Sequence, residues 1–423
     1  MKTKLFVALI ACCIPWLSPK ATAASAPAPS PHNPSRPKLP FPIIERFENF
    51  GIADGMPSHK IHCVLVTHDG TLLVGTAKGL LIRENGKFRK LGTEHGLSHQ
   101  IVLCLAEDQR NGDIWIGTMR GLNRYSAGRI NSYFQTTSGL PNNIIYGVAL
   151  FGDTLWVATA AGCGVLDLKT GSWKIYDHTN SQMHEPWVYS VAAANDRIFV
   201  GVWGSGILEY EPLRGVFKEY RDPDGDFHFD LVPDDGPVND ITAWLSWSDG
   251  LLWQATYFGM SRYDGLRWRT WQEKKSPLPS NFVQFIHARG RVAWVGTDNG
   301  LAVTDGDSWA VYARSESGDG NLEITYPDKT VEKIKMPTAL PNNFVLGIWA
   351  DDREAWFATS DGLGHGIFAA TSHAQTKRQA ETGSHKSSAH DTQNHVKSDD
   401  VNQKKPTPPN HAAVNNAQPA GNF

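Results

Sequence analysis

The chain of 423 residues has few of the features that mark helical membrane proteins or nucleic-acid-binding proteins. After the N-terminal leader no apolar run reaches the roughly 18 residues of a membrane span, and no heptad pattern occurs. Charged residues make up 20% of the chain, and the formal net charge is −3. The sequence therefore predicts no transmembrane helix after the leader, and it argues against nucleic acid as a partner because polyanions attract basic surfaces.

Common catalytic motifs are absent as well. The chain has no Gly-x-Ser-x-Gly, no His-Glu-x-x-His and no paired-cysteine metal spacing. We therefore assign no catalytic residue, no metal ligand and no cofactor from motifs. A secreted lyase or hydrolase that uses histidine and acidic side chains stays open as an alternative, because many chemistries occur on one fold.

The two ends of the chain differ in composition from its middle. Residues 1–23 read as a signal peptide, with Lys2 and Lys4, an apolar stretch and cleavage after Ala23. A second interpretation is lipoprotein processing that leaves a lipid anchor on Cys12. Residues 24–40 are a proline-rich leader, and residues 373–423 are a polar tail predicted to be disordered. We expect a periplasmic or secreted protein.

What the chain has is an internal repeat. Residues 139–162 read GLPNNIIYGVALFGDTLWVATAAG, which predicts a loop, a strand, a tight turn, a second strand and a glycine turn. The second strand recurs seven times, as LLVGT, IWIGT, LWVAT, IFVGV, LWQAT, AWVGT and AWFAT. The glycines that follow these strands are Gly79, Gly121, Gly162, Gly206, Gly259, Gly300 and Gly362.

A fourth strand has its own signature, two bulky apolar residues three positions apart. Six copies follow the glycine turns, at Phe88/Leu91, Ile130/Tyr133, Trp173/Tyr176, Phe217/Tyr220, Trp268/Trp271 and Trp309/Tyr312. The seventh, Phe47/Phe50, lies near the N-terminus instead. The N-terminal strand is therefore predicted to complete the last sheet and close the ring.

Four-stranded units at this period predict an all-β fold, a single seven-bladed β-propeller over residues 41–372. A β-solenoid or a pair of sandwiches would not explain the displacement of one fourth-strand signature from the C-terminal to the N-terminal end.

Three cysteines follow the leader, and an odd number in an exported chain cannot pair completely. Cys63 and Cys104 stand eight residues after Gly55 and Gly96, in the first strands of adjacent blades. We align them with Gly147, Ser190, Ala243, Phe285 and Gly347, of which all but Phe285 are small. Small residues suit close packing of innermost strands, so we expect free thiols; a disulfide between Cys63 and Cys104 is the alternative.

The cycle GLPNN…GDTLWVATAAG, with GLSHQ…GDIWIGTMRGL and LPNNF…REAWFATSDGL, resembles the two-component regulator propeller repeat. The resemblance covers residues 41–372. It implies the fold of the extracytoplasmic sensor half of bacterial hybrid two-component systems, many of which recognise oligosaccharides or their breakdown products. Those sensors usually have two propellers, a small β-sandwich, a membrane helix and a kinase, so here the resemblance implies a binding module rather than a signalling chain.

In such a meander the second-to-third and fourth-to-first connections emerge on one face, where we expect the ligand. Asn and Asp favour turns, which accounts for most of the Asn residues there. Turn geometry does not call for Trp203, Tyr257 and Phe258, and aromatic faces beside polar groups suit a sugar or peptide site. The predicted ligand-binding residues are Trp203, Tyr257, Phe258, Trp187, Arg120, Asp298, Asn299 and Asp361.

Two further stretches stand out. Asp222, Asp224 and Asp226 alternate like the start of a calcium loop, but the glycine is misplaced and no glutamate follows at the twelfth position, which favours a solvated turn. Residues 322–334 alternate like a hairpin with a Pro327-Asp328-Lys329 turn, which either pairs with a partner or packs on the sixth blade.

Together these features predict an exported, non-enzymatic propeller that binds a carbohydrate, peptide or protein on its loop-rich face. The alternatives are a secreted lyase or hydrolase, and a periplasmic assembly or scaffold protein that acts through the sixth-blade hairpin and the tail.

Overall fold

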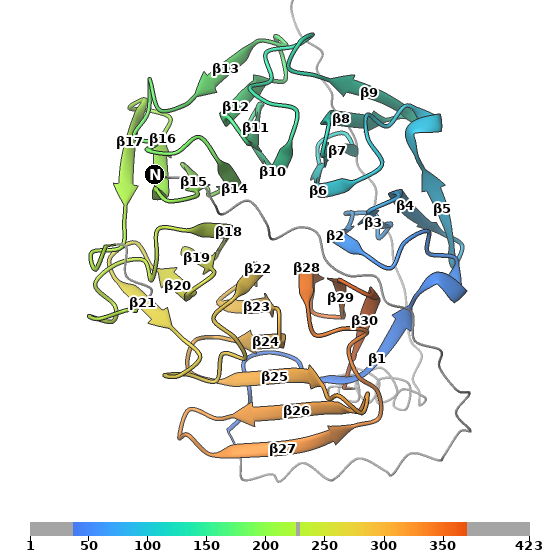
Figure 1. The fold of residues 1–423 in the computed structure, drawn as a ribbon, viewed down its shortest axis with the longest axis vertical. Coiled ribbons are helices and arrows are strands. Elements are labelled where there is room, and N and C mark those ends of the chain that lie inside the picture. Colours follow the sequence, from blue (N-terminus) through green and yellow to red (C-terminus); the bar gives the residue numbers. More distant parts are fainter. Residues whose placement is uncertain (1–36, 226–228, 370–423) are drawn as a thin grey trace, which may run out of the picture. The chain divides into compact units, whose positions relative to one another are not determined.

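The computed structural model describes residues 37–225 and 229–369, which form one ring of seven antiparallel β-sheets (Figure 1). Consecutive strands lie side by side from the axis outwards, so the predicted seven-bladed propeller is confirmed. In this part of the chain no helix has the length and apolar character to span a membrane. The predicted signal peptide, Cys12, residues 24–36 of the leader and the polar tail lie outside the described residues.

The blades follow the chain in order. Blades one to three are β2 (Ile61–Val66), β3 (Leu72–Thr76), β4 (Gly79–Glu84), β5 (Lys87–Leu91); β6 (Val102–Asp108), β7 (Asp113–Thr118), β8 (Gly121–Ser126), β9 (Arg129–Tyr133); and β10 (Ile145–Phe151), β11 (Thr154–Thr159), β12 (Gly162–Asp167), β13 (Trp173–Tyr176). Blades four and five are β14 (Val188–Ala193), β15 (Ile198–Val202), β16 (Gly206–Glu211), β17 (Val216–Tyr220); and β18 (Thr242–Ser248), β19 (Leu251–Thr256), β20 (Gly259–Tyr263), β21 (Trp268–Trp271). Blade six is β22 (Val283–Arg289), β23 (Val292–Thr297), β24 (Gly300–Thr304), β25 (Trp309–Arg314), β26 (Gly320–Thr325) and β27 (Val331–Met336). Blade seven is β28 (Val345–Ala350), β29 (Glu354–Thr359), β30 (Gly362–Phe368) and β1 (Ile44–Phe50). Short 3-10 turns, Ile52–Asp54 and Thr93–His95, precede blades one and two.

Each glycine that follows a second strand opens the third strand with a positive φ, 122° at Gly79 and 131° at Gly259. A Cβ at Gly79 would lie 2.7 Å from the carbonyl oxygen of Leu91, the last residue of the fourth strand. Only glycine adopts this conformation and leaves room for that carbonyl. The glycine period seen in the sequence therefore marks a steric requirement of every blade.

The core lies between neighbouring blades rather than within one sheet. The tryptophans of the second strands are buried there, and Trp115, Trp253 and Trp294 are at most 2% exposed. One cluster of buried side chains joins Leu80 of β4 to Val102 of β6, and similar clusters follow around the ring. Because each blade covers the apolar face of the next, an open ring would leave two such faces in water.

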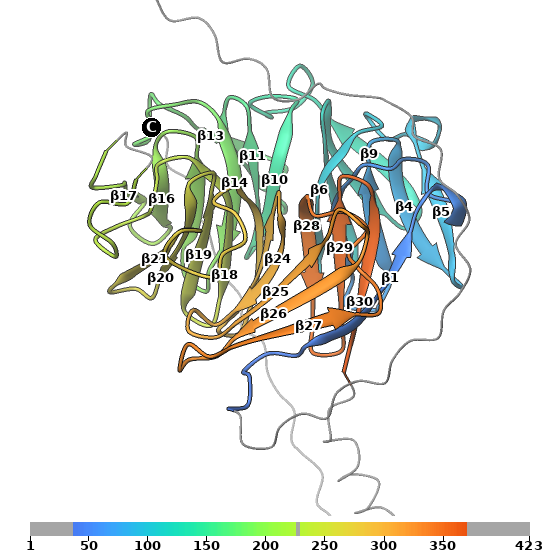
Figure 2. The same cartoon turned by 60° about the horizontal axis from the view of Figure 1, so that its bottom comes forward.

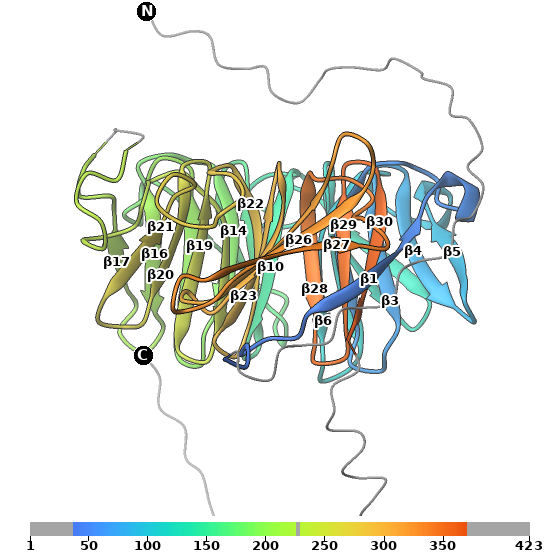
Figure 3. The same ribbon diagram turned by 90° about the horizontal axis from the view of Figure 1, so that it is seen from below.

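The N-terminal strand closes the ring, as predicted. β1 pairs antiparallel with β30, with Phe47 opposite Gly366 and Phe50 opposite Leu363 (Figure 3). Phe47 is 3% exposed, and its ring meets the rings of Tyr312 and Phe357 edge-on at 5.9 Å. The outer strand of blade seven therefore comes from the other end of the sequence.

The sixth-blade hairpin packs on its own blade. β26 pairs with β25 and with β27, which extends the sheet to six strands (Figure 2). Leu322 and Ile324 of the hairpin are buried, whereas Val331 and Ile334 of the outermost strand are 49% and 37% exposed. A contact of the hairpin with a partner protein stays a prediction.

The alignment of the small residues near the axis was wrong in blade five. In blade one a register shift after Ile61 places Cys63 opposite Gly75. The equivalent shift in blade five places Trp244, not Ala243, opposite Ala255. Trp244 packs against Phe285 of the next blade, with ring centroids 4.4 Å apart and ring planes at 31°, so an aromatic pair fills this part of the ring. Gly236 stands eight residues before Trp244, and the same count would have found it.

The three described cysteines, Cys63, Cys104 and Cys163, are buried and unpaired, as expected. Burial raises the pKa of each thiol, to about 12 for Cys104 and Cys163. They act as small apolar core residues.

The closure can be tested by truncating one side chain. Phe47→Ala should lower the free energy of unfolding by about 3–5 kcal/mol, because it removes a buried ring that joins β1 to blades six and seven. The matched control is Glu45→Ala in the same strand, where the side chain is exposed and the cost should stay below about 0.5 kcal/mol. Equal denaturation midpoints for the two variants would contradict the role of β1 in closing the ring.

Two histidines of the innermost strands predict a dependence of stability on pH. Burial lowers the pKa of His62 and of His287 to about 4, and at His62 the nearby charge of Lys60 lowers it further. An unfolded histidine titrates near about 6.5, so the unfolded chain binds more protons between pH 4 and 6.5. Stability contributed by these groups is present above that window and falls as the pH decreases through it.

We expect each histidine to remove on the order of 1–2 kcal/mol of stability between pH 6.5 and pH 5. His62→Leu is a suitable variant because blade two carries Leu103 at the equivalent place. The free energy of unfolding of this variant should fall less than that of the wild type between pH 7 and pH 5, measured by urea denaturation. Identical pH dependences would show that His62 is not held neutral.

Candidate functional site

The tips between second and third strands and the loops that lead into first strands meet at one end of the ring. The N–H of Gly121, at the tip of blade two, donates to the carbonyl of Asn143, 2.6 Å away in the loop before β10. Gly362 of blade seven donates in the same way to His59 at 2.7 Å. Such bonds also start from Gly162, Gly206, Gly259 and Gly300. We call this end the tip face.

Six aromatic side chains form a continuous series on the tip face, which we call the aromatic arc. In spatial order they are Tyr146, Tyr189, Trp203, Tyr257, Phe282 and Phe344, from blades three to seven. The centroids of neighbouring rings are 4.2–6.3 Å apart; Tyr257 and Phe282 are the nearest pair, and Phe282 and Phe344 the farthest. All six side chains are partly exposed. The arc therefore presents a half-buried apolar surface around part of the axial opening.

The three tyrosines of the arc are uncharged at neutral pH. Burial raises the pKa of Tyr146, Tyr189 and Tyr257 above the ordinary value of a phenol. Their hydroxyls are also close enough to influence one another. A ligand on the arc therefore meets ring faces and protonated hydroxyl groups rather than charge.

The sequence-predicted aromatic residues are partly brought together. Trp203 and Tyr257 meet edge to face, with centroids 5.5 Å apart and ring planes at 72°. Phe258 follows Tyr257 at the same tip and is half-buried, and its carbonyl accepts a hydrogen bond from Gln272 at 3.0 Å. Trp187 precedes β14 and is 39% exposed.

The other predicted site residues lie on tips of other blades. Arg120 and Asp298 are exposed at blades two and six. Asn299 donates through its side chain to the carbonyl of Pro279 at 3.2 Å, and Asp361 Oδ1 lies 2.7 Å from His59 Nδ1. A role of these residues in ligand binding stays a prediction.

Sequence reasoning missed four members of the arc. Tyr146 and Tyr189 follow the first residue of β10 and β14, and Phe282 and Phe344 directly precede β22 and β28. A signal was present, because each of the four residues is the direct neighbour of the buried residue that begins a first strand. Side chains at alternate places of a strand share a face, so the neighbours of Ile145 and Val283 had to point away from the blade core.

The asparagines of the tip face serve as turn residues, as expected. Asn142 Oδ1 accepts the N–H of Ile144 at 2.9 Å, and Asn143 Oδ1 accepts that of Gln135 at 2.8 Å. The side chains of Asn239, Asn281, Asn342 and Asn343 likewise accept backbone N–H groups. These amide oxygens already have protein donors.

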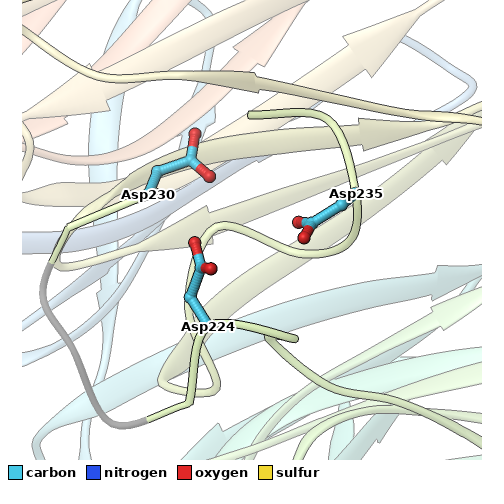
Figure 4. Close-up of side chains that lie close together, drawn as sticks. All are labelled: Asp224, Asp230 and Asp235. Carbon is cyan, nitrogen blue, oxygen red and sulfur yellow. The ribbon is translucent and has the colours of Figure 1, made fainter. Parts of the chain in front are cut away.

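An acidic cluster lies in the long connection between blades four and five. Carboxylate oxygens of Asp224, Asp230 and Asp235 lie within 4.8 Å of one another (Figure 4). Of the predicted calcium loop, Asp222 is 7% exposed, and burial raises its pKa to about 7, whereas Asp226 lies outside the described residues. Asp224 already accepts the N–H groups of Leu231 and Val232, so the cluster also works as a structural turn.

Comparison with known protein families gives one match. Residues 96–120 match the model of the two component regulator propeller. The matched segment runs from the loop before β6 through β7 to Arg120. No curated protein matches the chain.

Several solved structures share the fold. The extracellular domains of BT3049 and BT4673 from B. thetaiotaomicron, assigned to hybrid two component systems, superpose with a TM-score of 0.58 each, at 17% and 18% identity. The alignments cover 76% and 77% of this chain but 42% and 40% of those chains, so it spans about two fifths of their length. Virginiamycin B lyase from Staphylococcus aureus aligns with a TM-score of 0.55 and 14% identity over 77% of this chain and 99% of the lyase. At these identities the likeness shows the fold alone.

The family match lies on one complete first-strand and second-strand unit of blade two, and the same unit recurs around the ring with the same strand pairing. The resemblance inferred from the repeat is thus confirmed: the chain is a seven-bladed propeller with a two component regulator propeller repeat, similar in fold to extracellular sensor domains.

Proposed function

We propose that the protein is an exported, non-enzymatic binding module whose tip face takes a saccharide, peptide or protein ligand. The observation that carries this proposal is the aromatic arc. Its six rings touch in series and stay partly exposed. The repeat does not require aromatic side chains beside the first strands, because blades one and two carry Lys60, His62, Ile101 and Leu103 there. A contiguous apolar surface rimmed by polar groups is typical of a contact site.

The geometry favours binding without chemistry. On the described part of the tip face, His59 pairs with Asp361, and His184 Nε2 lies 2.9 Å from Glu219 Oε1. Both histidines are more than half exposed, and neither stands within the aromatic arc. The similar structures are extracellular domains of two component systems, which agrees with export of this chain.

Truncation of the arc tests the proposal. Trp203→Ala or Tyr257→Ala should weaken binding of the natural ligand at least tenfold, because aromatic anchors commonly contribute about 2 kcal/mol or more. The melting temperature should change by only a few degrees, since both rings are partly exposed. The measurement is calorimetric titration against glycans, peptides and the products of neighbouring genes.

Leu213→Ala is the matched control. Leu213 is 98% exposed in the turn between β16 and β17, at the other end of the blade that carries Trp203. This variant should bind as the wild type does. Unchanged affinity in both arc variants would place the site elsewhere on the propeller.

A further inference from the structure

Seven residues surround the axis at the tip face, one directly before the first paired residue of each innermost strand. The first paired residue of each innermost strand lies opposite the last residue of the second strand, as Ile61 lies opposite Thr76 and Val102 opposite Thr118. The residues before these first paired residues, which we call the collar, are Lys60, Ile101, Ile144, Trp187, Ile241, Phe282 and Phe344. Trp187 is exposed and the other six are partly exposed, so the collar is the rim that a ligand meets at the axis.

The collar is apolar except at one point. Six of its members are isoleucine, phenylalanine or tryptophan, and only Lys60 carries a charge. The carbonyl of Lys60 accepts the N–H of Ala77 at 3.1 Å, which places Lys60 beside the tip that bears Lys78. Arg120 occupies the equivalent place at the tip of the adjacent blade. The N–H of Lys78 donates to the hydroxyl of Thr76, and the N–H of Arg120 donates in the same way to the hydroxyl of Thr118. Three cations therefore lie on neighbouring blades at one side of an apolar rim.

None of these three cationic side chains forms an ion pair with any described residue. Asp361, at the tip of the adjacent blade seven, is engaged by His59 at 2.7 Å. Lys60 is only partly exposed, and its charge lowers the pKa of the neighbouring His62. An unpaired cation beside apolar surface attracts an anion more strongly than a fully hydrated one does, because the local dielectric is lower.

The hydrogen-bonding groups of the face separate the ligand classes. A saccharide places many hydroxyls against fixed amide and carboxylate groups, and unmatched polar groups are costly to bury. The amide oxygens of Asn142, Asn143, Asn281, Asn342 and Asn343 already accept backbone N–H groups. The collar offers apolar surface with a cationic side, and the arc adds ring faces and tyrosine hydroxyls.

We propose that the tip face binds a peptide with apolar side chains and one carboxylate, the apolar side chains on the collar and the aromatic arc and the carboxylate at Lys60, Lys78 and Arg120. This inference rests on the proposed binding function and specifies its ligand. Apolar side chains fit a rim of isoleucine and aromatic residues, and a carboxylate accepts charge-assisted hydrogen bonds from lysine and arginine. The carboxylate belongs either to the end of the peptide or to an Asp or Glu side chain.

The test uses three pools of synthetic octapeptides with Leu, Ile, Phe, Tyr or Trp at the last four positions. The first pool has a free C-terminal carboxylate and no acidic side chain. The second has a C-terminal amide and no acidic side chain, and the third has a C-terminal amide with one Glu among those positions. Binding to the whole chain is measured by fluorescence anisotropy, and the tightest members are titrated individually.

We expect members of the first or the third pool to bind at least tenfold more tightly than matched members of the second. Tight binding by the first pool alone assigns the carboxylate to the peptide end, and tight binding by the third assigns it to a side chain. Equal binding by all three pools, or no binding by any of them, would overturn the proposal.

Lys60→Ile isolates the charge, because isoleucine is the collar residue of blades two, three and five. This variant should lose about tenfold in affinity for peptides with a carboxylate, from the first or the third pool, and nothing for peptides of the second pool, which have none. The control is Lys87→Ile, an exposed lysine at the other end of blade one, which should bind as the wild type does.

Two outcomes separate this inference from the function on which it rests. Binding of neutral oligosaccharides that is lost in Trp203→Ala, without peptide binding, would reject the peptide and keep the tip face as the site. Carboxylate peptides that bind equally well to wild type and to Trp203→Ala and Tyr257→Ala would reject the arc as the site.

Discussion

The structure depends on one hydrogen-bonded turn that is repeated at the tip of the blades. In six blades the threonine that ends the second strand donates its hydroxyl to the carbonyl of the glycine three residues on, as Thr76 does to Gly79 at 2.8 Å. The same hydroxyl accepts the N–H of the second tip residue, such as Lys78 at 2.9 Å. Because the turn uses only a hydroxyl and backbone groups, the tip side chains are free to vary.

Blade four shows what happens when the threonine is missing. Val202 has no hydroxyl, its tip is one residue longer, and the carbonyl of Gly206 is instead bonded by Thr242 of the next blade at 2.9 Å. Gln254 donates in turn to Thr242 at 2.8 Å, so the glutamine that stands where the other second strands carry Val, Ile or Phe supports the repair. The longer tip carries Trp203, and the departure from the repeat thus coincides with an anchor of the aromatic arc.

The sequence predicts what every blade must share and misses what arises between blades. Strand order, glycine turns and the closing strand were predictable because each follows from a steric or pairing need that recurs seven times, and Phe47 kept the fourth-strand signature at a distant place. Trp203 and Tyr257 were predictable because they break the tip pattern. Tyr146 and Phe282 were not found: the alternation of the first strand indicates that their side chains point away from the blade core, but their contacts with rings of neighbouring blades leave no pattern in the sequence. Trp244 was misaligned after the long connection that precedes β18, although the count of eight residues from Gly236 points to it.

The division between a fixed turn and free tip side chains also explains how one ring acquires two chemical sides. The backbone turn is the same at blades one and five, yet the first presents Lys78 and the second Tyr257 and Phe258. Since neither side chain takes part in the turn, charge and aromatic surface are placed on opposite sides of the axis without a change in the strands. The collar is held in the same way. The carbonyls of Lys60 and Ile101 accept backbone N–H groups of their own tips, so the side chains of these residues take no part in holding the fold. Specificity in this propeller therefore resides in positions that the fold holds by their backbone alone.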